Sequence, residues 1–458
     1  MSNKDTKTQL DAELGLTKTK TWMTPRRGIP RFLQKKQGLA LTSDVVDWQV
    51  NHGSLLKRIS LDTRIPEDPS ECYSVGVTVF PTLFPRAQFN RACELQPVYS
   101  ELYCAIADDE EWLLEAIHDL LPVDPLLQLS PGTESSLGAV ERSDILLKQV
   151  EFNTFSCAGV TYATKVAEMH RYLARAGAYE SGDEGPLPIT LKSLPRRNNV
   201  ESLADCLASA HEAYGPRSTA VLFVVQPDNF NIADERPIEY ASFSSTRYGW
   251  GSKTVEISVA YMRADYEAHE YGDAGKEARL RIELSRAIRC PFMLSHICTF
   301  KKVQCVLTAP EALERFLLQE KADIIRSTFV PMYPLDNSDS GAYARQLATD
   351  RKLSRDYMKP SLEGGGHNIC GGEIPRFLAS IPKAKWSAYI LMERIQPPSV
   401  VNILLSSAGL DSGGVVSELA IFRTCLWRRG GGSRCEMLQN EVGGWALKTM
   451  RRLMRCVF

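Results

Sequence analysis

A ten-residue stretch from Lys359 to Asn368 combines a cation, a carboxylate, three consecutive glycines and an amide. Glycines let backbone N–H groups approach phosphate oxygens, because no Cβ stands in the way. Lys359 could place a positive charge on the phosphates, and Glu363 could bind Mg²⁺, which prefers oxygen ligands. The spacing is neither that of a Walker A loop nor that of a Rossmann fingerprint. The stretch is typical of a nucleotide-triphosphate site, although a glycine run is also typical of a plain flexible turn.

A second candidate site lies in residues 146–155, whose alternating pattern predicts a β-strand. Glu151 and Asn153 are two residues apart in it, so both side chains point to the same face. A carboxylate and an amide oxygen on one face could form half of a magnesium site. An exposed polar strand face is the alternative interpretation.

Three further cations could bind anionic groups. Arg142 precedes the predicted strand, and Arg263 follows another predicted strand at 255–262, with Tyr266 close behind. An arginine at a strand end can hold a carboxylate through two parallel hydrogen bonds, but it can equally form a surface ion pair. Lys301 could reach a phosphate, although a lysine pair such as Lys301-Lys302 is commonly just solvated.

The composition narrows the class of protein. The chain has 458 residues, 44% hydrophobic and 24% charged, with a formal net charge of −1. This length predicts two or three domains or one large composite fold. The near-zero charge argues against a broad nucleic-acid interface, which needs a basic excess. No apolar run approaches the roughly 18 residues of a membrane span, so no membrane association is expected.

The twelve cysteines form no Cys-x-x-Cys pair, and the seven histidines show no zinc-site spacing. We therefore expect mostly buried, inert thiols in a reducing compartment, the cytoplasm, without a disulfide framework. The first forty residues carry acidic side chains among the basic ones. Transit peptides are poor in acidic residues, so we do not interpret this segment as a targeting signal. Residues 1–70 show no sustained periodicity and are predicted to form a disordered extension and linker.

Helical and strand patterns alternate along the rest of the chain, which favours an α/β or α+β fold. Helices are expected over 84–121 (with an acidic turn at 108–111), 162–176, 203–214 and 274–287. Strands are expected over 146–155, 220–225 and 255–262, and a glycine- and proline-containing connection over 180–197.

The order of several motifs resembles eukaryotic glutathione synthetase over roughly residues 75–450. The matching segments, in chain order, are Val79–Pro85, Arg142–Asp144, Gln149–Thr154, Arg263-x-x-Tyr266, Lys301–Gln304, Lys359–Asn368, Tyr389–Ile395 and Ser417–Leu419. The Gln-Val-Glu-Phe-Asn-Thr and Glu-Gly-Gly-Gly segments are specific to that family.

The resemblance implies an α/β (α+β) ATP-grasp fold with an inserted α/β substrate-binding domain, working as a homodimer with ATP and Mg²⁺. It implies ligation of γ-glutamylcysteine to glycine through an acyl phosphate, giving glutathione, ADP and phosphate. The expected divisions are a divergent extension at 1–70, the N-terminal ATP-grasp part at 71–217, the substrate-binding domain at 218–306 and the C-terminal ATP-grasp part at 307–458.

Roles carried over from the family fall on matching positions. The magnesium ligands would be Glu151, Asn153 and Glu363. The nucleotide contacts would be Glu151, Lys301, Lys359, Glu363, Gly364, Gly365, Gly366, Asn368, Met392, Glu393, Ile395 and Glu418. The substrate contacts would be Arg142, Ser156, Asn231, Arg263, Tyr266 and Lys448, and the residues expected to act in catalysis are Arg142, Lys359 and Arg263.

The chain departs from the family on the substrate side. The segment after Asn153 is two residues short, and the family's hydroxyl contacts are reduced to Ser156. Glu235 stands where the family has a glutamine, and its carboxylate would repel an anionic dipeptide unless it is protonated or turned away. The other replacements, in chain order, are Phe230 for an arginine, Asp265 for a glycine, Leu362 for an arginine and Cys370 for a tyrosine.

The C-terminal segment departs most. Lys448 replaces a substrate arginine and Met450 an ATP lysine, and the family's glycine- and alanine-rich closing loop does not follow. Two hypotheses therefore stand: an active ligase of the glutathione synthetase type, and a catalytically impaired, nucleotide-binding and dimerising relative.

Overall fold

The structure is a computed structural model of the whole chain. It describes residues 37–58, 70–123, 136–141, 146–155, 158–180, 189–196, 198–215, 218–226, 229, 231–242, 254–264, 266, 270–350, 357–360, 368–428 and 436–451. Among these residues the strands form four sheets, of six, four, three and two strands.

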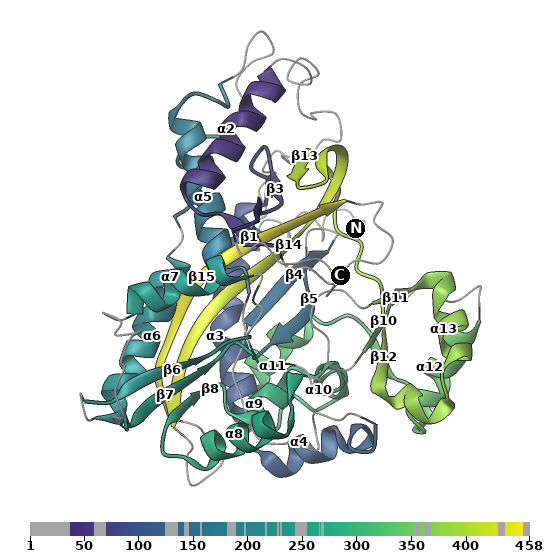
Figure 1. Cartoon of the computed structure of the whole chain (residues 1–458). Coiled ribbons are helices and arrows are strands. Elements are labelled where there is room, and N and C mark those ends of the chain that lie inside the picture. The colour runs from purple at the N-terminus through teal and green to yellow at the C-terminus, as the bar shows by residue number, and fades with distance from the viewer. Residues whose placement is uncertain are drawn as a thin grey trace, which may run out of the picture.

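The six-stranded sheet crosses the centre of the molecule (Figure 1). Its strands run in the order β3 (Val77–Thr78), β13 (Val400–Ser406), β14 (Gly409–Arg428), β4 (Ser136–Glu141) and β5 (Leu146–Asn153), and β15 (Glu436–Arg451) pairs with β14. The pairing throughout this sheet is antiparallel. The long hairpin of β14 and β15 was not predicted from the sequence.

The main core lies on one face of this sheet. Phe152, Leu419 and Ile421 are almost fully buried there and pack against helices. The helical elements of this region are α3 (Arg86–Asp108), α4 (Glu110–Ala116), η2 (His118–Leu120), α9 (Met293–Cys298), α10 (Lys301–Leu307) and α11 (Gln319–Arg326). Because successive side chains of a strand point to opposite faces, burying these apolar side chains leaves the polar residues of the site on the other face of the sheet.

A four-stranded antiparallel sheet forms a separate lobe, on the right in Figure 1. Its order is β11 (Ile369–Cys370), β10 (Tyr357–Pro360), β12 (Tyr389–Met392) and β9 (Met332–Pro334). Helices α12 (Asp339–Thr349) and α13 (Ile374–Ser380), with short 3₁₀ turns η5 (Gly371–Glu373) and η6 (Lys383–Ala388), accompany it. Leu335, Ala344, Leu378 and Leu391 are buried in its small core.

A three-stranded parallel sheet forms the third unit. It consists of β6 (Ala220–Val224), β7 (Ile257–Met262) and β8 (Ile288–Cys290), connected through α7 (Ile232–Ser242) and α8 (Asp273–Leu284). Helix α6 (Asn199–Tyr214) packs against it through Leu207 and Ala210. All three strands fall within residues 218–306, where the substrate-binding domain is expected.

The N-terminal segment corrects one expectation. Residues 37–58, placed by the sequence in a disordered extension, contain helix α2 (Gln37–Asn51) and strand β1 (Leu55–Lys57), which pairs with β2 (Cys72–Ser74). Leu41, Val45 and Trp48 are buried against α5 (Val160–Arg175) and its surroundings. Their spacing of four and three residues is a helical signal, which the polar residues between them obscured.

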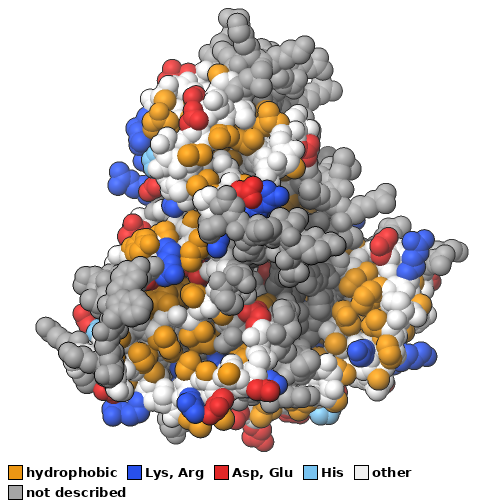
Figure 2. Space-filling view, viewed as in Figure 1, with side chains coloured by type: hydrophobic (Ala, Val, Ile, Leu, Met, Phe, Trp, Pro, Cys, Tyr) orange, Lys and Arg blue, Asp and Glu red, His pale blue; other side chains and the backbone are white. Residues whose placement is uncertain are grey.

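The other predicted elements agree with the structure within a few residues. The helices expected at 84–121, 162–176, 203–214 and 274–287 correspond to α3 with α4, α5, α6 and α8, and the expected strands to β5, β6 and β7. Charged side chains of both signs are mixed with hydrophobic ones over the face in Figure 2, in keeping with the formal net charge of −1. Within the described ranges, no helix combines the length and apolar character that a membrane span requires.

The cysteines match the expectation only in part. Eight of them, in the described part of the chain, are free thiols, and five of these eight are buried. Cys370 takes part in a disulfide, contrary to the prediction that the thiols are reduced. A disulfide depends on which cysteines the fold brings within bonding distance. The spacing of scattered cysteines along the chain does not predict this, so the sequence could not reveal the bond.

Candidate functional site

The centre of the site is a glutamate between two buried lysines. The Glu151 carboxylate, near the end of β5, lies 3.2 Å from Nζ of Lys301 and 4.0 Å from Nζ of Lys359. Lys301 begins α10 and Lys359 lies in β10, so three separate elements meet here. The two lysine side chains are 1% and 2% exposed, whereas that of Glu151 is 23% exposed. Among the described residues, two buried cations therefore meet one carboxylate, at a point that solvent or a ligand can reach through Glu151.

The two lysines set the ionisation of Glu151. Burial alone would raise the pKa of this carboxyl, but the charges of Lys301 and Lys359 outweigh it and lower the pKa to about 2. Asn153 donates from Nδ2 to Glu151 Oε1 at 2.9 Å, as expected for two side chains on one strand face. Thr299 donates to Asn153 Oδ1 at 3.4 Å and so orients the amide. Glu151 is thus an ionised oxygen ligand with an amide oxygen beside it.

The sheet register brings the C-terminal hairpin to the same face. Glu151 is aligned across the strands with Gly138, Ala420 and Ala446. Side chains of aligned residues share a face, and so do residues two apart in a strand. Glu418 and Lys448 pair with each other and lie two positions from the pair Ala420 and Ala446. Their side chains therefore lie on the face that carries Glu151.

Asn368 directly precedes β11, which pairs with β10, the strand that contains Lys359. Its side-chain oxygen and nitrogen are both buried and have no hydrogen-bond partner among the described residues. A buried amide with both atoms unsatisfied is costly, and a bound ligand would satisfy it.

An apolar cluster adjoins Lys359, which pairs with Ile390 of β12. Met392 and Ile395 are buried in this cluster, and Glu393 donates its backbone N–H to Pro331 O at 2.9 Å while its side chain is exposed. The cluster consists of Val150, Cys305, Val330, Met332, Ile390, Met392 and Ile395. An apolar surface beside phosphate-binding cations suits a flat heterocyclic base.

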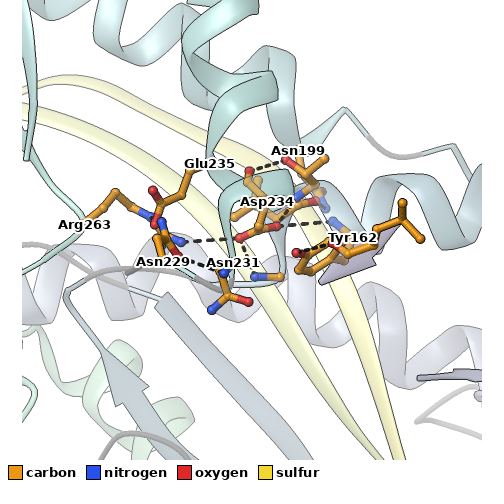
Figure 3. Close-up of polar contacts among 11 residues, drawn as sticks. Tyr162, Asn199, Asn229, Asn231, Asp234, Glu235 and Arg263 are labelled. Atoms are coloured by element: carbon orange, nitrogen blue, oxygen red, sulfur yellow. Dashed lines mark hydrogen bonds and ion pairs between the residues drawn. The ribbon is translucent and has the colours of Figure 1, made fainter. Parts of the chain in front are cut away.

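The second ion cluster has the opposite charge balance (Figure 3). Arg263, just after β7, lies between two carboxylates on α7. Its Nη2 is 3.4 Å from Asp234 Oδ2, and its Nε is 3.3 Å from Glu235 Oε1. All three side chains are almost fully buried. Burial raises the pKa of Glu235, and the positive charge of Arg263 offsets only part of that rise.

Asp234 caps the start of helix α5, a role that the sequence did not reveal. Its carboxylate accepts the backbone N–H groups of Gly159 and Thr161, each at 2.8 Å, and that of Tyr162 at 3.3 Å. These are the free N–H groups at the start of α5, so Asp234 caps a helix from a distant part of the chain. The backbone carbonyl of Asn231 accepts the N–H of Asp234 at 2.8 Å and shapes this turn.

An aromatic stack connects the two ion clusters. Phe155 follows β5, and its ring lies 5.6 Å from that of Tyr266. His296 of α9 stacks on Phe155 at 4.1 Å and on Tyr266 at 5.7 Å between ring centroids. Burial holds the pKa of His296 well below its usual value, so this ring is neutral at physiological pH. The half-buried Tyr266 ring is thus held in place by Phe155 and His296.

Several predicted site residues lie outside the described part of the chain. These are Arg142, Ser156, Glu363, Gly364, Gly365 and Gly366. Of the described ones, the structure brings Glu151, Asn153, Lys301 and Lys359 together, while Arg263 and Asn231 belong to the second cluster. No three His, Cys, Asp or Glu side chains gather to hold a metal within the described ranges.

Sequence reasoning missed three residues that position the site: Asp234, Thr299 and Lys302. Lys302 joins α10 to the four-stranded lobe, because its Nζ lies 2.6 Å from Asp336 and 3.2 Å from Asp119. The signal for Lys302 existed as the Lys-Lys pair, whose second member is anchored rather than solvated. Asp234 and Thr299 carry no local pattern that distinguishes them from ordinary polar residues.

Comparison with known proteins decides the family. The model of the eukaryotic glutathione synthase ATP-binding domain matches residues 35–129 and 136–454. The chain belongs to this family. It is 28% identical to the glutathione synthetase large chain of Schizosaccharomyces pombe, over 88% of this chain and 91% of that one. It is 29% identical to the glutathione synthetase of Homo sapiens, over 85% of this chain and 89% of that one.

The fold agrees with the family. A solved structure of a glutathione synthetase-like effector from Globodera pallida, in the apo form, matches with a TM-score of 0.68, 19% identity, and coverage of 93% of this chain and 97% of that one. The predicted α/β architecture of the ATP-grasp type is confirmed. The match begins at residue 35, which agrees with the ordered helix α2 and not with an extension reaching to residue 70.

Proposed function

We propose that this protein is an ATP-dependent ligase that joins γ-glutamylcysteine to glycine and releases glutathione, ADP and phosphate. The cysteinyl carboxylate attacks the γ-phosphorus of ATP, forms an acyl phosphate and displaces ADP. The amine of glycine then attacks the acyl carbon, and phosphate leaves. Neither step needs a protein nucleophile, so positioning and charge neutralisation supply the catalysis.

The observation that carries this proposal is the Glu151–Lys301–Lys359 cluster in a chain of this family. Among the described residues, two buried ammonium groups meet a single carboxylate there, and ammonium groups are suitable ligands for the oxygens of a polyphosphate. ATP would draw Lys301 and Lys359 from Glu151 to its phosphate oxygens. Lys359, as the cation in the glycine-rich segment, is the one we assign to the γ-phosphate and its transition state.

The donor set at Glu151 fits magnesium. An ionised carboxylate with an amide oxygen two residues away offers the hard oxygen ligands that Mg²⁺ takes, and Glu363 would supply a third. When bound, the ion would neutralise charge on the phosphates. Met392, Glu393 and Ile395 would contact the adenine, Asn368 and the glycines 364–366 the phosphates, and Glu418 the nucleotide from the hairpin.

The substrate side would hold the dipeptide and the acceptor. Arg142, Ser156, Asn231, Arg263, Tyr266 and Lys448 are the contacts proposed, with the arginines on carboxylates. Lys448 is exposed on the face that carries Glu151, where a substrate could reach it. The proposal includes a homodimer in the cytoplasm, which size-exclusion chromatography with light scattering and cell fractionation would test.

A turnover assay tests the proposal directly. Purified protein with ATP, Mg²⁺, γ-glutamylcysteine and glycine should release ADP and form glutathione in equal amounts. The Glu363→Ala and Lys359→Met variants are the controls, because each removes a group assigned to the metal or the phosphates. Omitting glycine should stop glutathione formation, and chelating Mg²⁺ should stop ADP release.

The alternative is an impaired relative that binds nucleotide without ligation. It rests on Lys448 and Met450, which replace an arginine and a lysine of the family pattern. ATP binding with no ADP release above the Glu363→Ala control would favour this alternative. Equal formation of ADP and glutathione would exclude it.

A further inference from the structure

The two carboxylates around Arg263 are not equivalent. Asp234 is committed to three backbone N–H groups of α5, so its ion pair with Arg263 is secondary. Glu235 makes no such contact with backbone N–H groups among the described residues. Its Oε1 faces Arg263 Nε at 3.3 Å, and the Asn229 side chain also hydrogen-bonds the Glu235 carboxylate. Figure 3 shows the Glu235 side chain reaching toward Arg263, apart from the contacts of Asp234 with α5.

This arrangement places a protein carboxylate where a substrate carboxylate would bind. A carboxylate that arrives at Arg263 must displace Glu235 or lie beside two like charges in a poorly solvated site. Like charges a few ångströms apart repel strongly there, because the local dielectric constant is low. A neutral group meets no such repulsion, and an amide could donate a hydrogen bond to the Glu235 carboxylate.

We propose that Glu235 determines acyl-donor specificity by occupying Arg263, so that the site takes a donor with a neutral group at this point at least as well as one with a carboxylate. The inference rests on the proposed ligase function. The cysteinyl carboxylate must stay free, because it attacks phosphorus. The carboxylate that can be neutralised is therefore the α-carboxylate of the glutamyl residue.

The test compares two donors on two variants. One donor is γ-glutamylcysteine, and the other is the same dipeptide with its glutamyl α-carboxylate converted to a primary amide. Dissociation constants are measured calorimetrically with Mg²⁺ and a non-hydrolysable ATP analogue. The wild type should bind the amide as tightly as the parent or more tightly. Glu235→Gln should tighten the parent by roughly tenfold, the size of one relieved charge repulsion, and should reverse the preference.

Glu239→Gln is the matched control. Glu239 lies one turn further along α7 and pairs with Arg236 instead of Arg263. Its substitution should leave the ratio of the two dissociation constants unchanged. A tenfold preference of the wild type for the parent, a ratio unaffected by Glu235→Gln, or binding of neither donor would overturn the proposal.

Two further measurements keep the outcomes separate. Release of ADP is followed with both donors. If ATP binds but no ADP is released, the ligase function is contradicted, and the ratio of the two dissociation constants still decides the role of Glu235.

If Glu235→Gln does not fold, the pH dependence of donor binding to the wild type decides. The parent should bind more weakly as the pH rises above the ordinary range of a glutamyl carboxyl and Glu235 ionises, and the amide should lose less affinity over the same rise. The other ionisable groups that face the cluster are Asp234, Arg263, Tyr162 and Lys165; equal pH dependence for both donors would contradict the proposal.

Discussion

The ion cluster around Glu151, proposed as the nucleotide side, and the one around Arg263, proposed as the substrate side, have opposite arrangements of charge. At the first, one carboxylate lies between two buried lysines, and at the second, one buried arginine lies between two carboxylates. The pKa of Glu151 falls because cations surround it, whereas that of Glu235 rises because burial outweighs its single cation. The same residue type is therefore a charged ligand in one cluster and a group prone to protonation in the other. Among the described residues, cations outnumber the carboxylate in the first cluster, and carboxylates outnumber the cation in the second.

The largest effect is expected at the substrate side, from Asp234→Ala. The change leaves the N–H groups at the start of α5 without an acceptor and Arg263 with one carboxylate fewer. We expect a loss of about 3–5 kcal/mol in the free energy of unfolding, as for other broken buried ion pairs. Urea denaturation measures it. Asp234→Asn keeps an acceptor oxygen and should lose clearly less; equal losses would mean that the cap does not matter.

On the nucleotide side, Lys359→Met should remove a cation from the phosphate site without breaking a helix cap. ATP binding should weaken by about 2–4 kcal/mol, or roughly 30- to 1000-fold in Kd. Isothermal titration calorimetry measures the change. Lys302→Met is the control, because this neighbouring buried lysine pairs with Asp119 and Asp336 and should affect stability but not ATP affinity. The assignment of the phosphate site fails if both variants lose affinity alike.

The two clusters should also differ in acid. The pKa of Glu151 is lowered from 4.5 to about 2, so its contribution to stability is complete above pH 4.5 and is lost as the pH falls toward 2. The shift corresponds to about 3 kcal/mol. Unfolding curves of the wild type and of Glu151→Gln should therefore converge as the pH is lowered through this range. Curves that stay parallel would show that the lysines do not stabilise the charged form.

The smallest expected effect concerns the orientation of Asn153. Thr299→Val removes the hydroxyl that donates to Asn153 Oδ1 and to Phe152 O. Losing one such hydrogen bond costs about 1 kcal/mol, so the Mg²⁺ concentration at half-maximal ATP binding should rise roughly fivefold. Thr299→Ser keeps the hydroxyl and should behave like the wild type. A rise that is the same for Val and Ser would point to packing instead.

Much of the fold followed from periodicity, and the failures have physical causes. Helices α3, α5 and α6 and strand β5 have regular apolar patterns, so local sequence predicts them. Helix α2 was missed because its polar residues hide three apolar positions. The long β14–β15 hairpin was missed because its stability comes from pairing along most of its length, which no short window shows.

The sequence by itself determined the family and the residue types at the site, because the order of Glu151, Lys301, Lys359 and Asn368 is carried by motifs. Only the tertiary structure decided the charge balance. Whether a glutamate is ionised, and whether an arginine is available to a substrate, depends on burial and on partners far away in the chain. Glu235 looked like a repulsive substitution in the sequence. The fold turns it onto Arg263, where the two side chains form a buried ion pair.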